Sequence, residues 1–312
     1  MLEALKAQAV YHTSMSTALS RFRPLRQADS ARLRAGWRAL LPVVAVLAAA
    51  SLVGAAARGV SMPYRTTVVQ LGAAAVTVAV FVGWARSVDH RPLAAYGLRI
   101  DRGWVADLAA GALVAGGVVA GSVATALALG WVEVTGIAVS PTGSFALPFA
   151  AFLVSWVGVA VWEELAFRGL FLTNAAEGFR RWLDGRAAVL AAWVVVSVVF
   201  GVLHLQQAPT PASLLLWIAV GAVPGLAYVL SGELSFALGF HFAVDAAVNA
   251  AFNLGGAEGV PSLFGLAQTG PEAMVGATGY VTVAWLLLAV PLTLAWAATR
   301  HGLAVDERVG GR

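Results

Sequence analysis

Eight stretches of the chain are long and apolar enough for transmembrane helices, and they constrain its fold more than any other feature. One helix needs about 20 apolar residues to cross the hydrocarbon core of a bilayer. We therefore predict an all-α, polytopic bundle of about eight transmembrane helices. The stretches, the fourth of which is open to extension, run from Ala39 to Ala57, Thr66 to Ala85, Leu108 to Leu129, Phe145 to Leu165, Ala187 to Leu205, Ser213 to Leu230, Phe236 to Leu254 and Tyr280 to Thr299.

The composition agrees with a membrane protein and removes several kinds of chemistry. Of 312 residues, 60% are hydrophobic and 12% are charged, whereas about 25% of the residues in a soluble domain are charged. The chain has no cysteine, which excludes disulfides, thiolate-bound zinc and a cysteine nucleophile. A nucleophile must therefore be an oxygen-bearing side chain or water.

Lysine and arginine are concentrated in alternate loops, which predicts the orientation of the chain. They gather before the first stretch, after the second and fourth, and in the C-terminal tail, while the loops after the third, fifth and seventh contain none. Cytoplasmic loops collect these residues, so we expect a multi-pass protein of a prokaryotic plasma membrane with both termini in the cytoplasm. Only Arg58 and Arg65 depart from this pattern. The net charge of +4 is explained by the same loops, so no nucleic-acid partner is expected.

The chain is predicted to consist of a helix bundle and two short cytoplasmic ends. Residues 1–35 form a basic segment, either a helix lying on the inner membrane surface or a partly ordered tail. No cleavable signal peptide is expected in it, because a continuous apolar core is missing. Residues 36–300 hold the bundle, and residues 301–312 form a cytoplasmic tail.

Six ionisable side chains lie inside the apolar stretches, although a charge at the bilayer centre costs at least about 2.5 kcal/mol. Asp107, in contrast, lies at the edge of a stretch, where it is expected to reach water. Because the six occur only in the fourth, fifth and seventh stretches, we predict one shared polar site. They are Glu163, Glu164, Arg168, His204, His241 and Asp245.

Helical spacing separates the two adjacent glutamates. Glu164 and Arg168 are four residues apart on one helical face, which predicts an internal salt bridge. Glu163 is rotated by about 100° from that face and is left free to act. Helix packing alone would explain the Glu164 and Arg168 pair, but it explains Glu163 and the two histidines poorly.

The other two helices each contribute a polar face. In the seventh stretch, His241, Asp245 and Asn249 occupy successive turns, and the residues around them are small or apolar. In the fifth stretch, Phe200 lies one turn before His204. A lone helical histidine is more often a packed residue than a ligand, but the combination of three such helices favours a functional site.

Two kinds of hydrolytic chemistry fit these residues. In one, a carboxylate takes a proton from water, while imidazoles orient that water or stabilise the developing oxyanion. In the other, His204, His241 and Asp245 bind zinc and leave a coordination position open, with Glu163 as the base. The usual HExxH spacing is missing, so both alternatives remain open.

Three motifs in order resemble a known family. "EELAFR", "FGVLH" and "HFAVD" match the patterns EExxxR, FxxxH and HxxxD on successive predicted helices. The chain thus resembles the CPBP family of intramembrane proteases, which includes the type II CAAX prenyl endopeptidases and bacterial relatives tied to bacteriocin processing or self-immunity. The motif-bearing core runs from about residue 145 to 254.

The resemblance implies a role for each motif residue. Glu163 would be the general base, His204 would help to hold the hydrolytic water, and Glu164 with Arg168 would support the motif helix. His241 and Asp245 would line the oxyanion side, where many family members carry Asn in place of Asp. An ionised Asp245 cannot donate a hydrogen bond, so it must be protonated, bind a metal, or leave that role to Asn249 or His241.

The resemblance implies an intramembrane endopeptidase acting on a peptide or membrane-protein substrate. A prenylated CAAX-like substrate and a bacteriocin-type substrate are both open. The alternatives are a non-catalytic membrane scaffold with the same fold and a proton-coupled transporter. A transporter of this kind is expected to show inverted repeats or paired broken helices, and the sequence shows neither.

Helix depth sets a condition on the predicted site. A helix that begins near Ala187 carries His204 roughly 25 Å from the cytoplasmic side, whereas Glu163 and His241 are expected nearer that side. Either this helix begins at Leu190 or later, or the helices are tilted or offset. If the Glu163 and His204 side chains lay more than ~10 Å apart, they could not share one water.

Overall fold

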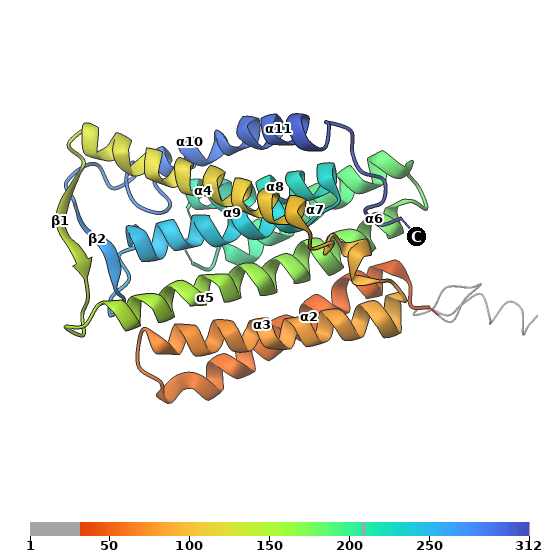
Figure 1. Ribbon diagram of the computed structural model, residues 1–312, viewed down its shortest axis with the longest axis horizontal. Helices are drawn as coiled ribbons and strands as arrows, with labels where there is room; N and C mark the ends of the chain where they lie inside the picture. The colour runs from red at the N-terminus through yellow and green to blue at the C-terminus, as the bar shows by residue number, and fades with distance from the viewer. Residues whose placement is uncertain (1–31, 208–209, 312) are drawn as a thin grey trace, which may run out of the picture.

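The computed structural model describes residues 32–207 and 210–311, and it is a bundle of helices with a small sheet at one end (Figure 1). Most of the predicted N-terminal segment, residues 1–31, therefore lies outside the described residues. The long helices are α2 (Ala35–Ala56), α3 (Tyr64–Trp84), α4 (Arg102–Ala128), α5 (Ala146–Glu164), α7 (Gly185–His204) and α8 (Pro211–Ser231). The shorter ones are α6 (Thr173–Phe179), α9 (Ser235–Asp245), α10 (Tyr280–Leu287) and α11 (Ala289–Arg300).

Within the described residues, seven continuous helical segments are long and apolar enough to cross a membrane. This confirms the predicted polytopic helical bundle. The remaining predicted span, the seventh, Phe236–Leu254, corresponds to the 11 residues of α9 and the six of a following π-helix, η5 (Ala246–Ala251). This segment stops before Leu254, and Asn253 just beyond it adopts a left-handed backbone conformation with φ 44°, which is incompatible with continued helix.

The fourth predicted span is much longer than expected. Helix α5 continues through a π-helix, η4 (Leu165–Leu172), into α6, so that one 34-residue helical segment runs from Ala146 to Phe179. The fifth span begins at Gly185, where Asp184 caps it by accepting a hydrogen bond from the Ala187 backbone N–H at 2.9 Å. It does not begin at Leu190 or later. His204 is therefore as deep in the bundle as the sequence implied, and the longer fourth span must bring Glu163 to the same depth.

Glycine allows the closest helix contacts in the bundle. A Cβ atom at Gly239 of α9 would collide with the backbone carbonyl of Leu108 in α4, and one at Gly111 would collide with the carbonyl of Phe236. Small residues of this kind let membrane helices approach closely. Helix α9, which carries His241 and Asp245, is therefore held firmly against α4.

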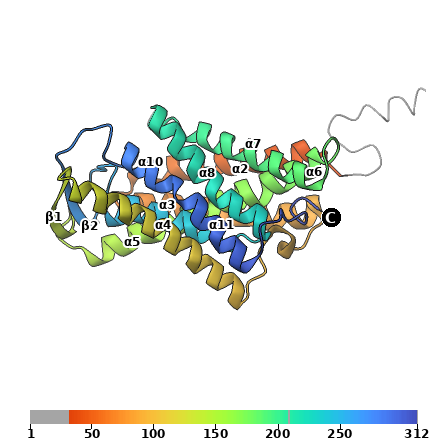
Figure 2. The same cartoon turned by 90° about the horizontal axis from the view of Figure 1, so that it is seen from above.

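The structure also contains a small sheet, which the sequence analysis did not predict. Strands β1 (Val132–Val139) and β2 (Ser262–Gln268) pair antiparallel, with Val132 opposite Gln268 and Val139 opposite Ser262. They lie in the segments that follow α4 and η5. Both views place this sheet at one end of the bundle and the C-terminus at the other (Figures 1 and 2).

The end opposite the sheet holds a buried ion cluster. Arg38 of α2 is fully buried and donates to Asp89 at 2.8 Å and to Asn174 at 2.7 Å. Asp89 also accepts from the Tyr96 hydroxyl at 2.6 Å, and burial together with Asp89 raises the pKa of Tyr96 far above its usual range. The cluster therefore joins α2 to the segments that hold Asp89 and Asn174 at the arginine-rich end.

A second polar cluster corrects the expectation for Asp107. This residue is only 2% exposed rather than in contact with water. Its carboxylate accepts hydrogen bonds from Trp296 Nε1 at 3.1 Å, Arg300 Nε at 2.9 Å and His301 Nε2 at 2.9 Å. The three partners lie at the end of α11, so the cluster joins that helix to α4.

Candidate active site

The three helices predicted to share a polar site do bring their ionisable residues together. Glu163 Oε2 lies 3.7 Å from His204 Nε2 and 3.6 Å from His241 Nε2. His241 Nε2 lies 3.5 Å from Asp245 Oδ2. The separation of Glu163 and His204 is therefore well within the ~10 Å that sharing one water requires.

The length of the fourth span resolves the question of depth. Counted at 1.5 Å per residue, Glu163 lies about 24 Å from the end of its helical segment at Phe179. His204 lies about 28 Å from the start of α7 at Gly185, so the two residues reach similar depths. The offset expected from the sequence disappears because the fourth span extends beyond Leu165.

Glu163 occupies the last turn of α5, immediately before the π-helix η4. Single π-turns within α-helices occur frequently at functional sites, because the wider turn changes the direction of nearby side chains. The Oε2 atom of Glu163 is buried and has no hydrogen-bond partner among the described residues. A buried carboxylate oxygen without a partner is costly, which sets Glu163 apart from an ordinary packed residue.

Both histidines present the same ring nitrogen to Glu163. The Nδ1 atom of His204 lies 2.8 Å from the carbonyl oxygen of Phe200, and its ring stacks on Phe200 with centroids 4.3 Å apart. Trp217 covers the ring from a second direction, with centroids 4.8 Å apart. A carbonyl can only accept, so Nδ1 carries the proton, and the Nε2 lone pair of neutral His204 points toward Glu163.

Glu164 makes two contacts where the sequence predicted one. Its Oε1 atom accepts from Arg168 Nη1 at 2.8 Å, as the spacing predicts, and also lies 2.6 Å from His241 Nδ1. A carboxylate that binds one ring nitrogen fixes the orientation of the imidazole and directs the other nitrogen outward. Glu164 therefore positions His241 as well as supporting its own helix.

Arg168 also serves a second helix. Pro224 lies inside α8 and has no N–H to donate to the carbonyl of Val220, one turn earlier. Arg168 Nη2 donates to the carbonyl oxygens of Gly221 at 2.7 Å and Val220 at 3.3 Å. It thus satisfies backbone groups beside the proline while remaining paired with Glu164.

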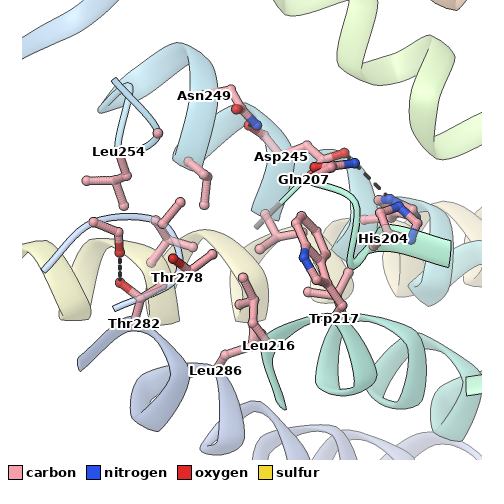
Figure 3. Close-up of a pocket in the computed structure, with 18 of the residues that line it drawn as sticks. His204, Gln207, Leu216, Trp217, Asp245, Asn249, Leu254, Thr278, Thr282 and Leu286 are labelled. Atoms are coloured by element: carbon pink, nitrogen blue, oxygen red, sulfur yellow. Dashed lines mark hydrogen bonds and ion pairs between the residues drawn. The ribbon is translucent and has the colours of Figure 1, made fainter. Parts of the chain in front are cut away.

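Asp245 and Asn249 continue the polar face of α9 into η5. The Nδ2 atom of Asn249 donates to the backbone carbonyl of Asp245 at 3.0 Å, which leaves one of its two N–H groups available. Both side chains line a cavity in the bundle, where Figure 3 shows them together with His204.

A cavity of ≈ 530 Å³ connects these residues to the sheet end of the bundle. Its deep part is lined by Glu163, His204, His241 and Asp245, and its outer part includes Gln268 from β2 and the segment from Val275 to Thr278. Sequence reasoning missed the outer residues, because they lie in a loop and a strand with no motif. Other polar lining residues that it missed are Gln70, Gln207, Trp217, Glu272 and Thr282.

The sequence also predicts that His204, His241 and Asp245 could bind zinc. In residues 32–207 and 210–311, no group of three or more His, Asp or Glu side chains forms a site that could hold a metal ion. The set of His204, His241 and Asp245 therefore stays a prediction from the sequence.

Comparison with known proteins supports the resemblance. Residues 145–247 match the family model described as type II CAAX prenyl endopeptidase Rce1-like. The match spans α5 to the start of η5 and contains the four residues of the deep cavity. No curated protein and no solved structure matches the chain.

Proposed function

Because residues 145–247 carry a type II CAAX prenyl endopeptidase Rce1-like domain, we propose that this multi-pass membrane protein is an endopeptidase in which Glu163 activates water. The family is one of proteases, so the reaction class is hydrolysis of a peptide bond. The substrate is then a peptide or a membrane protein.

One observation carries the proposal. The buried, unpartnered Oε2 of Glu163 faces the Nε2 atoms of two histidines at 3.7 and 3.6 Å. These distances are too long for good hydrogen bonds, so the three groups face one point rather than pair with each other. A water at that point has an acceptor for its proton in Glu163 and a second acceptor in His204.

In the proposed reaction, Glu163 acts first as a base and then as an acid. The Glu163 carboxylate takes a proton from water while the water oxygen bonds to the substrate carbonyl carbon, which gives a tetrahedral oxyanion. His241 in its imidazolium form donates from Nε2 to this oxyanion, and Asn249 offers an amide N–H nearby. When the C–N bond breaks, Glu163 returns its proton to the leaving nitrogen.

Asp245 has a supporting part in this scheme. As an ionised carboxylate it cannot donate to an oxyanion, but its Oδ2 atom lies 3.5 Å from His241 Nε2. There it stabilises the imidazolium form of His241. We therefore assign the oxyanion contact to His241 and the amide, rather than to Asp245.

The test compares the membrane proteomes of cells with the wild-type chain and with Glu163→Gln. We expect a precursor to accumulate with Glu163→Gln and with His204→Ala. The matched control is Glu258→Gln, which removes an exposed carboxylate outside the cavity. Purified Glu163→Gln protein that cleaves the precursor at the wild-type rate would refute the proposal.

The same assay addresses zinc. The purified protein is treated with a chelator, the chelator is removed, and cleavage of the precursor is measured with and without added zinc. An unchanged rate after chelation supports water activation by Glu163 alone. Loss of activity that zinc restores assigns a metal to the reaction.

A further inference from the structure

We propose that the cavity opens on the non-cytoplasmic side of the membrane and receives its peptide substrate from that side. This inference rests on the proposed endopeptidase function for the nature of the substrate. The direction in which the cavity opens stands independently of activity.

The first step is the position of the cavity mouth. The outer lining residues come from β2, from the loop after it and from the start of α10, and include Gln268, Glu272 and Thr278. His204 is the last residue of α7, and Trp217 lies in the second turn of α8, so both helices meet the cavity at their sheet ends. Figure 3 shows Thr278 and Thr282 along the same cavity as His204 and Trp217.

The second step is the distribution of charge between the two ends. The connections opposite the sheet hold most of the basic residues, whereas the connections at the sheet end hold only Arg58 and Arg65 in the described parts of the chain. Three carboxylates, Glu133, Glu258 and Glu272, lie at the sheet end as well. Arginine-rich loops stay in the cytoplasm, so the sheet end, and with it the cavity mouth, faces the other side.

The third step is the charge of the cavity itself. Three carboxylates, those of Glu163, Asp245 and Glu272, line it, and none of the described lining residues is Lys or Arg. A peptide whose C-terminal carboxylate must enter the cavity would meet like charge and find no Lys or Arg to pair with, and the imidazolium of His241 already faces three carboxylates. The lining therefore favours an internal segment of neutral or basic peptide over a free C-terminal tail.

Together these observations describe a substrate class. It is an extended segment of a secreted peptide or of a membrane protein, exposed beside the membrane on the non-cytoplasmic side. A prenylated C-terminal tail in the cytoplasm does not reach this mouth.

The chain is well suited to a direct test, because it contains no cysteine. Thr278→Cys places a single thiol in the cavity mouth, and Leu183→Cys places one on the exposed loop between α6 and α7 at the opposite end. Neither substitution changes a charge or touches the proposed catalytic groups. Cells expressing each variant are treated with a membrane-impermeant maleimide, both intact and after permeabilisation.

We expect Thr278→Cys to be labelled in intact cells and Leu183→Cys to be labelled only after permeabilisation. The opposite pattern, or labelling of Thr278→Cys only in permeabilised cells, would overturn the inference. If Thr278→Cys is not produced or does not react, Glu272→Cys, at an exposed residue of the same mouth, decides between the two outcomes. Because labelling needs no cleavage, its result is independent of the proposed function.

Discussion

The Nδ1 atom of His241 lies 2.6 Å from Oε1 of Glu164, and the same oxygen accepts from Arg168 at 2.8 Å. The second glutamate of the motif therefore links the polar face of α9 to its own helix. The first glutamate, Glu163, has a carboxylate oxygen with no partner among the described residues. Two adjacent, identical side chains thus have different physical tasks, and their variants should differ accordingly.

Replacement of Glu164 by Gln is expected to destabilise the protein. It leaves the buried Arg168 without its ionic partner, and breaking a buried pair in this way costs about 3–5 kcal/mol. The change is measured as a fall in the melting temperature of the detergent-purified protein. Equal melting temperatures for the wild type and Glu164→Gln would contradict the assigned role.

Replacement of Glu163 by Gln is expected to abolish cleavage without lowering the melting temperature. The amide cannot take a proton from water, and loss of a general base typically reduces the rate by about 10²–10⁴. No ion pair with Arg or Lys is lost, because the described contacts of Glu163 are to histidines. A melting temperature as low as that of Glu164→Gln would show that Glu163 is structural instead.

The ring of Trp217 is expected to position His204. Trp217→Ala removes one of the two rings that hold the imidazole and should slow cleavage mainly through kcat, whereas Trp217→Phe keeps an aromatic surface and should retain most activity. The measurement is steady-state cleavage of the accumulated precursor. Equal kcat values for the two variants would show that the ring contact does not matter.

The buried ion cluster at the arginine-rich end is expected to stabilise the fold away from the site. Arg38→Ala leaves Asp89 buried with fewer partners, so the free energy of unfolding should fall by about 3–5 kcal/mol. Arg86→Ala, at an exposed position in the same region, is the control and should change stability by no more than about 0.5 kcal/mol. Similar melting temperatures for the two variants would refute a stabilising role for the cluster.

Helical periodicity in the sequence predicted much of the local arrangement. The apolar stretches identified the membrane helices, and the four-residue spacing identified the pair of Glu164 and Arg168. The three motifs in their order indicated a resemblance that the family model matching residues 145–247 supports. These predictions succeed because hydrophobic length and helical spacing are local properties that hold in any bundle.

Other features depend on contacts between distant segments, so no local pattern contains them. The end of the fourth span illustrates this, because the extension through η4 into α6 passes through residues whose helical state depends on packing against neighbouring helices. The contact between Glu164 and His241 is a second example, since residues 77 positions apart meet only in the folded bundle. The sheet is a third, because β1 is formed only when β2 pairs with it.

The sequence by itself determined that this protein is a helical membrane bundle with one polar site carried by three helices, because burial in lipid restricts charges to places where they are needed. The tertiary structure decided which atoms of that site face each other and where the cavity opens. It did so through the close packing of α9 on α4, which fixes His241 opposite Glu163, and through the loop after β2, which forms the mouth at the sheet end.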